Sequence, residues 1–233
     1  MLKNLQAEAR RLTNPAKAKI LARFFKTGVG EYGAGDKFLG IMVPQSRVLA
    51  RKYKNLPLSQ IQSLLKSPYH EERLIALLIL VYKFPKNPKA IYDFYLSHTK
   101  YINNWDLVDL TAPKIVGEYL LDKSPDILFK LAKSDNLWER RIAILATFAF
   151  IYQGNPEPTL QISKLLLFDK HDLIHKAVGW MLREVGKRCG EKRLTDFLDL
   201  NLSLLPRTTL RYAIERLPKA TTHRYMSRQT RLP

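Results

Sequence analysis

The sequence predicts an all-α fold, a right-handed superhelical solenoid of about six HEAT-like helical hairpins with a basic concave face. Apolar residues recur at helical spacing almost throughout, and no stretch shows the alternation of a strand. Asn-Pro or Ser-Pro pairs occur five times. Such a pair favours a helix start, because the polar side chain caps free amides and proline suits the first turn. The formal net charge of +18 makes the surface of such a stack strongly basic.

The repeat period comes from the last three of these pairs, which begin at Asn87, Ser124 and Asn155. They lie 37 and 31 residues apart, close to the period of HEAT or armadillo helical hairpins. An irregular helical bundle would show the same apolar periodicity and stays open as an alternative. No Ser- or Gly-rich linker divides the chain, so we expect one domain over residues 1–233.

The first helices are expected before residue 26, and a Gly-rich segment follows over residues 26–43. Gly28, Gly30 and Gly33 match the pattern G-x-G-x-x-G, but a dinucleotide site requires a strand before the glycines, and here a helix precedes them. Glu31 inside the segment also opposes a phosphate. We therefore interpret residues 26–43 as a solvent loop between the first repeats.

The next informative element is NNWDLVD at residues 103–109. Asn103 or Asn104 can cap a helix there, and Asp106 then complements the helix dipole in the first turn. Asp109 lies deeper in the helix among apolar neighbours, and Pro113 breaks or kinks the helix just beyond it. Asp106 therefore has a structural explanation, whereas Asp109 is a candidate functional carboxylate.

Each of the three tryptophans lies within one helical turn of a charged residue, on the same helix face. Each pair alone is typical of a core aromatic residue beside a solvated charge. Three such pairs in successive repeats would share the concave surface of a solenoid. The pairs are Trp105 with Asp109, Trp138 with Arg141, and Trp180 with Arg183.

Several other classes of site and location are disfavoured. His171 and His175 are four residues apart but lack the glutamate and third ligand of a zinc protease. Cys189 has no histidine near it in sequence, which favours a buried or surface thiol over a reactive one. We expect no metal and no cofactor. The longest apolar stretches, such as residues 142–152, are too short to cross a membrane. The N-terminus does not resemble a signal peptide, and a single cysteine fits a reducing compartment, so we expect a cytoplasmic protein.

The charge points to a polyanionic partner. Beyond Leu205 there are seven Lys and Arg residues, and Glu215 is the one acidic residue among them. Composition alone leaves nucleic acid and an anionic membrane surface equally open.

Three stretches decide between these partners by resemblance. NNWDLVD at 103–109, SDNLWERRIAIL at 134–145 and IHKAVGWMLREVGK at 174–187 resemble, in order and spacing, the signature stretches of the AlkD-like DNA glycosylases. That DNA alkylation repair family is built from HEAT-like repeats, and the resemblance covers roughly residues 58–217. It implies a DNA repair hydrolase whose concave face binds duplex DNA and which releases cationic purines such as 3-methyladenine and 7-methylguanine.

The resemblance also implies roles for individual residues. The catalytic aspartate of the family falls on Asp109, and its two site-lining tryptophans fall on Trp105 and Trp180. Arg141 matches a DNA-contacting arginine, and Arg183 lies where a further backbone contact is expected. The family often has a tryptophan pair before the aspartate, whereas this chain has Asn104 before Trp105. The other residues expected to hold DNA phosphates are Lys176, Arg207 and Arg211.

We expect a monofunctional DNA-alkylpurine glycosylase that acts on double-stranded DNA as a monomer, with no membrane and no obligate protein partner. One alternative is a catalytically silent relative that binds damaged, bent or branched DNA. It is disfavoured because Trp105, Asp109 and Trp180 are all present. A protein-binding helical scaffold is the second alternative, and it would not require arginines beside the tryptophans.

Overall fold

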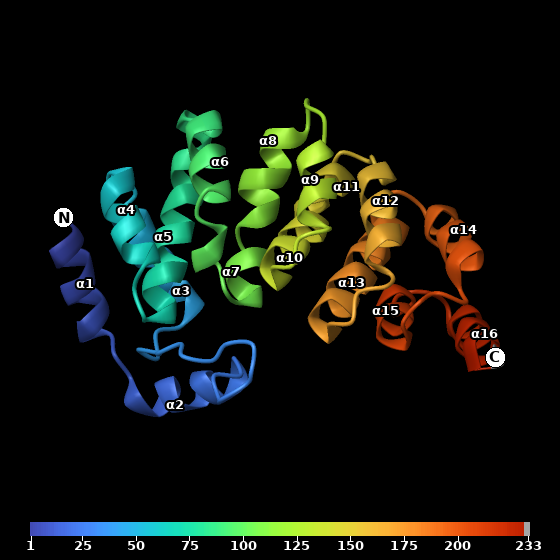
Figure 1. The fold of residues 1–233 in the computed structure, drawn as a ribbon, viewed down its shortest axis with the longest axis horizontal. Helices are drawn as coiled ribbons and strands as arrows, with labels where there is room; N and C mark the ends of the chain where they lie inside the picture. The colour runs from blue at the N-terminus through green and yellow to red at the C-terminus, as the bar shows by residue number, and fades with distance from the viewer. Residues whose placement is uncertain (231–233) are drawn as a thin grey trace. The chain divides into compact units, whose positions relative to one another are not determined.

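The computed structural model describes residues 1–230, most of which are helical (Figure 1). Within this range there is no β-strand, only an isolated bridge between Lys37 and Tyr69. None of the described helices is long and apolar enough to cross a membrane. The predicted all-α, helical-repeat fold class is confirmed.

Contacts between residues divide the chain into two compact units, Met1–Thr111 and a second unit that begins at Ala112. That the two units form the single domain expected over residues 1–233 stays a prediction. The first unit contains α1 (Leu2–Arg11), α2 (Pro15–Phe24), α3 (Val43–Lys52), α4 (Leu58–Leu65), α5 (His70–Lys83), η1 (Phe84–Lys86), α6 (Pro88–Leu96), η2 (Thr99–Tyr101) and α7 (Trp105–Asp109). The second contains η3 (Pro113–Gly117), α8 (Glu118–Leu120), α9 (Asp126–Leu131), α10 (Leu137–Ala146), α11 (Phe148–Tyr152), α12 (Glu157–Leu166), α13 (Asp172–Arg188), α14 (Glu191–Asn201), α15 (Arg207–Ala213) and α16 (Lys219–Thr230).

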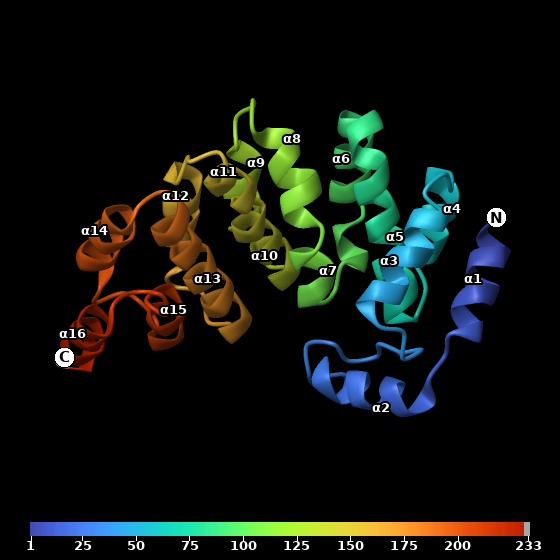
Figure 2. The same cartoon turned by 180° about the vertical axis from the view of Figure 1, so that it is seen from behind.

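Helix α5 forms the centre of the first unit. Its residues 70–80 are all buried, because α3, α4, α6 and α7 pack around it. Figure 2 shows α3, α4 and α6 beside α5 from the opposite side. A helix that is apolar on every side is expected in such a central position. Two acidic residues are nevertheless buried in its first turn, and each has a partner. Glu72 pairs with Arg10 of α1 at 2.9 Å. Glu71 accepts hydrogen bonds from backbone amides of the loop between α2 and α3.

The interpretation of residues 26–43 as a solvent loop is correct for the first half and wrong for the second. Residues 28–31 are exposed, but Leu39, Gly40 and Ile41 are buried. Their amides donate to the Glu71 carboxylate at distances of 2.8 to 3.2 Å. Gly40 has a φ of +82°, and a Cβ there would lie 2.1 Å from the Asn14 carbonyl oxygen. The loop is therefore fixed onto the first turn of α5.

Helix α13 has the corresponding central position in the second unit, where it contacts α10, α12, α14 and α15. Gly179 allows α15 to approach closely, because a Cβ at this position would lie 2.5 Å from the carbonyl oxygen of Thr209. This contact accounts for the glycine of the Gly-Trp pair in the sequence. The glycine faces α15, and the tryptophan that follows it points in another direction.

The Asn-Pro and Ser-Pro pairs precede helices as predicted. Asn14 accepts a hydrogen bond from the Lys17 amide at 3.0 Å, and Asn155 accepts one from the Glu157 amide at 3.1 Å. The basic segment from residue 219 forms α16. Arg231, the last of its basic residues, lies outside the described range.

Candidate functional site

Helix α7 carries Trp105 and Asp109 at its two ends. Asn104 precedes it as predicted for a cap, and its side-chain oxygen accepts a hydrogen bond from the Trp105 amide at 2.9 Å. Because the two residues are four positions apart, they lie on one face of the helix. The local sequence thus brings an indole and a carboxylate together on one short helix.

Trp105 is half-buried and packs against two phenylalanines at the end of α2. Its ring stacks on Phe25 with centroids 5.1 Å apart and meets the edge of Phe24 at 5.8 Å. Phe25 is buried, whereas Phe24 is 60% exposed. One side of the indole therefore has a fixed aromatic support.

The two carboxylates of α7 occupy different environments. Asp106 is buried, and its Oδ2 lies 2.8 Å from Nε2 of His70. Asp109 is half-buried at the last residue of the helix. Burial raises the pKa of the Tyr95 hydroxyl, the hydrogen bond with Thr111 opposes this rise, and the charge of Asp109 adds to it. Asp106 thus forms a buried pair with His70, whereas Asp109 is partly exposed to solvent.

Beneath α7 lies a network of buried polar side chains that the sequence did not predict. His70 contacts Asp36 through Nδ1 at 3.3 Å, and Arg73 pairs with Asp36 at 2.6 Å. Burial opposes protonation of His70, but the charge and hydrogen bond of Asp106, assisted by Asp36, raise its pKa to about 9. Burial likewise opposes ionisation of Asp36, yet its hydrogen bond with His70 and the charge of Arg73 keep its pKa below the ordinary value.

The chain changes its helical geometry directly after Asp109. Helix α7 ends there, and Pro113–Gly117 form a π-helix before α8 begins. The predicted break or kink beyond Asp109 is confirmed. Single π-turns are frequent near functional sites, where they change the direction of the chain.

The second unit places Trp180 and Arg183 on α13, one turn apart. Trp180 is half-buried, and its ring lies against Phe148 with centroids 6.0 Å apart. Arg183 is mostly buried and forms an ion pair with Glu215. These contacts support both side chains at the partly exposed surface of α13.

The structure places Arg141 in the interior of the second unit. Its exposed fraction is 5%, and Nη1 donates to the carbonyl oxygen of Leu173 at 2.5 Å, which links α10 to the start of α13. A contact between this guanidinium and DNA stays a prediction. Its neighbour Arg140 pairs with Asp169 at 2.6 Å.

The remaining predicted phosphate ligands are more accessible. Lys176 is half-buried and pairs with Asp172 at 2.6 Å. Arg207 and Arg211 are exposed on α15, the helix that packs against α13. Lys176, Arg207 and Arg211 therefore belong to two adjacent helices of the same unit.

His171 and His175, the histidine pair singled out in the sequence, form contacts around the start of α13. His171 Nδ1 accepts a hydrogen bond from the Leu173 amide at 3.1 Å, as a helix cap does. His175 Nε2 lies 2.5 Å from the Asp169 carbonyl oxygen. In the part of the chain that the structure describes, no group of three or more His, Cys, Asp and Glu residues is placed to hold a metal ion.

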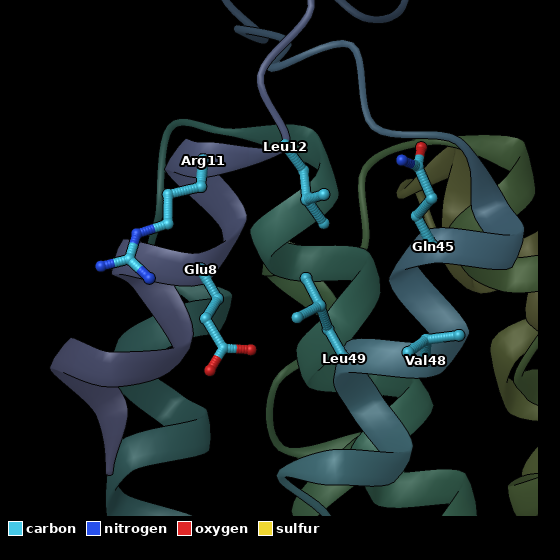
Figure 3. A pocket seen from close by; sticks show the side chains of 6 residues that line it. All are labelled: Glu8, Arg11, Leu12, Gln45, Val48 and Leu49. Carbon is cyan, nitrogen blue, oxygen red and sulfur yellow. The ribbon is translucent and has the colours of Figure 1, made fainter.

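A pocket of about 360 Å³ lies between α1 and α3 (Figure 3). Its lining is mainly apolar, and Glu8 pairs with Lys52 at 2.6 Å. A second pocket, of about 480 Å³, lies between α9 and α12. None of the predicted site residues lines either pocket. The lining of the first consists of Glu8, Arg11, Leu12, Gln45, Val48 and Leu49.

Sequence reasoning missed the support of α7. Asp36 was hidden in a segment interpreted as a loop, and His70 was a lone histidine at a helix start. No local signal in the sequence locates Asp36, but the two acidic residues directly after His70 indicate that this helix start has polar partners elsewhere in the chain. Buried acids require partners, and here their partners lie in α1 and in the second half of the loop.

The site therefore lies in an all-α helical-repeat fold of strongly basic overall charge, with an indole and a carboxylate on one short helix. The model of the DNA alkylation repair enzyme family matches residues 5–217, so this chain belongs to that family. A solved structure, a predicted DNA alkylation repair enzyme from Enterococcus faecalis, matches with a TM-score of 0.71 and 19% identity over 89% of this chain and 97% of that chain. At this identity the likeness establishes the fold. A comparison with curated proteins gives no match.

Proposed function

We propose that this protein is a monofunctional DNA glycosylase that hydrolyses the N-glycosidic bond of cationic N3- and N7-alkylated purines in double-stranded DNA. The family match supports a role in the repair of DNA alkylation. The observation that carries the finer assignment is the separation of the two α7 carboxylates. Asp106 is held by His70, whereas Asp109 remains partly exposed beside the tryptophan of the same helix.

The chemistry requires few groups from the protein. An alkylated purine already carries a positive charge, so the base can leave without a general acid. The charge that develops during departure is an oxocarbenium ion on the deoxyribose. Asp109 is proposed to stabilise this cation and to position the water that attacks the anomeric carbon. The N-glycosidic bond breaks with its electron pair on the purine, which becomes neutral. The water oxygen bonds to the anomeric carbon, and the water proton passes to the Asp109 carboxylate and from there to solvent.

The size of this effect is adequate for catalysis. Two unit charges about 4 Å apart interact by about 4 kcal/mol at an effective dielectric constant of 20. If that attraction arises only in the transition state, it corresponds to a rate increase of roughly a thousandfold. Trp105 and Trp180 are proposed to contact the deoxyribose, where the faces of their rings attract a cation.

DNA binding is proposed to rest on phosphate contacts from Arg141, Lys176, Arg183, Arg207 and Arg211. Such contacts position a duplex without reading its sequence. Arg207 and Arg211 are the most exposed of the five. Arg141 would act from the interior, where it already bonds the Leu173 carbonyl.

The deciding experiment measures base release from a duplex that carries one 7-methylguanine, with a 3-methyladenine duplex in parallel. Wild type and Asp109→Asn are compared under single-turnover conditions at saturating protein. We expect release by the wild type and a rate at least about 10³-fold lower for Asp109→Asn. The matched control is Asp93→Asn, because Asp93 is an exposed aspartate of the same unit paired with Lys89, and we expect it to retain the wild-type rate.

Three other outcomes are informative. If Asp109→Asn loses DNA binding as well as release, Asp109 has a structural role. If the wild type binds the duplex tightly but releases neither base, the glycosylase proposal is wrong and a silent DNA-binding relative is favoured. If the wild type does not bind duplex DNA, the protein-scaffold alternative is favoured.

A further inference from the structure

We propose that His70 is a positioning residue that holds α7, and with it Trp105 and Asp109, through a buried ion pair and an aromatic stack. The expected effect of His70 on base release rests on the proposed function. The contacts of His70 and the fluorescence experiment below do not depend on that function.

Each of the two ring nitrogens of His70 faces a carboxylate. Nε2 lies 2.8 Å from Asp106 Oδ2, and Nδ1 lies 3.3 Å from Asp36 Oδ2. The imidazole is only 2% exposed. A ring that faces a carboxylate with each nitrogen fulfils both contacts only as the doubly protonated cation, which donates from both. His70 is therefore a cationic bridge from α5 to both the loop and α7.

The aromatic part connects the same ring to Trp105. Phe25 and Phe38 lie against the imidazole, with centroid distances of 4.8 and 4.7 Å. Phe25 also stacks on the indole of Trp105 at 5.1 Å, with an angle of 21° between the planes. A cation is favoured against aromatic faces. One phenylalanine thus contacts both the cationic imidazole and the tryptophan of the proposed site.

Helix α7 depends strongly on such support. It has five residues, and a helix of that length is not stable without tertiary contacts. Asp106 lies between Trp105 and Asp109 in sequence, so its pairing with His70 fixes the rotation of the helix. Asn103 adds a second attachment, because its Nδ2 donates to Asp36 Oδ1 at 2.8 Å.

The charged groups around His70 define what deprotonation would do. Asp36 faces it from the loop, Asp106 from α7, and Arg73 of its own helix pairs with Asp36. Burial opposes the charged imidazole, but the two carboxylates outweigh burial and Arg73 and raise the pKa of His70 to about 9. Loss of the proton leaves one ring nitrogen facing a carboxylate as an acceptor. The attachment of α7 or of the loop then weakens.

The first experiment follows Trp105 without any DNA. Trp138→Phe and Trp180→Phe together leave Trp105 as the only tryptophan, and its emission is measured from pH 6 to pH 10. We expect a transition with a midpoint near pH 9 that His70→Gln removes. The matched control is His98→Gln, because His98 is a half-buried histidine of the same unit that contacts Gln62 and stacks on Phe94. It should keep the transition.

A second variant makes the test independent of whether His70→Gln folds. Asp106→Asn removes the charge that raises the pKa of His70 while it keeps an oxygen as acceptor. The Trp105 transition should therefore move to lower pH. An unchanged transition in either folded variant would overturn the proposal, because the indole would then not respond to His70.

Activity provides the second readout. With all three tryptophans present, His70→Gln should lower the single-turnover rate of base release at pH 7 on the order of a hundredfold, with the Kd for duplex DNA changed less than twofold. An unchanged rate would overturn the positioning role. If the wild type releases no base, the proposed function fails, while the fluorescence titration still decides whether His70 positions Trp105.

Discussion

Asp106 and Asp109 lie three residues apart on α7 but have different surroundings. Asp106 is buried in a pair with His70. The other is left half-buried at the helix end. This difference in surroundings is why the proposed chemistry is assigned to Asp109 and not to Asp106.

The pairing of His70 predicts a dependence of stability on alkaline pH. Its pKa is about 9 in the fold, compared with 6.5 for an unperturbed histidine, so the native state binds the extra proton between these values. This contribution is fully present below pH 6.5 and is lost as pH rises through 9. The expected slope is about 1.4 kcal/mol per pH unit, on the order of 3 kcal/mol in total.

Urea unfolding of wild type and His70→Gln at several pH values from 6 to 10 measures this contribution. The free energy of unfolding of the wild type should fall across the window, and that of the variant should fall much less. Equal slopes for the two proteins would show that His70 does not keep its proton in the fold.

Sequence reasoning identified the residues of α7 but not what holds them. Asn104, Trp105 and Asp109 could be located because capping and helical spacing are local properties. The contact between Asp36 and His70 spans 34 residues of sequence, and a single sequence holds no local signal for it. Arg141 shows the same limit, since its burial follows from the packing of α10 on α13.

The second half of the loop before α3 is buried as part of the core. Three consecutive amides of this loop donate to the carboxylate of Glu71, which is 1% exposed. The interaction is of the same kind as in a helix cap, because backbone amides donate charge-assisted hydrogen bonds to a carboxylate. The solvent-loop interpretation is wrong for the second half of the loop, because glycine-rich composition predicts turns but not what the turns pack against.

Glu71→Gln tests this element. The neutral amide loses the charge-assisted hydrogen bonds and places an NH₂ group against backbone donors, so we expect a destabilisation of about 2–4 kcal/mol. Urea unfolding gives the free energy, and hydrogen exchange of the Leu39, Gly40 and Ile41 amides should accelerate. The control is Glu191→Gln, an exposed position on α14. A loss below about 0.5 kcal/mol for Glu71→Gln would contradict the anchoring role.

The protein carries a formal net charge of +18, which should make its binding to DNA sensitive to salt. A duplex bound through phosphates releases counterions, so the logarithm of the binding constant should fall linearly with the logarithm of the salt concentration. Arg211→Ala should reduce the magnitude of that slope by about one. Binding titrations between about 50 and 200 mM salt provide the measurement.

The control for the salt experiment is Lys130→Ala, which removes the same charge from an exposed position on α9. Its slope should equal that of the wild type. Equal reductions for both variants would mean that Arg211 acts through the general charge of the protein and not through a phosphate contact.

The fold as a whole was the most predictable property. Helical periodicity and proline-marked starts are repeated along the chain, so errors at single positions do not change the conclusion. The same redundancy lets a protein of 19% identity share the fold at a TM-score of 0.71. The boundary between the two compact units at Thr111 and Ala112 had no such signal, because no change in composition marks it.

The π-helix at Pro113–Gly117 also sets the rotation at which α8 begins. A π-turn closes its hydrogen bond over five residues instead of four, so it is wider than an α-helical turn. Removal of one residue from this stretch would restore ordinary winding and rotate the start of α8 by about 100° relative to Pro113. Gly117 tolerates no such rotation, because a Cβ there would already lie 2.2 Å from the Ala146 carbonyl oxygen.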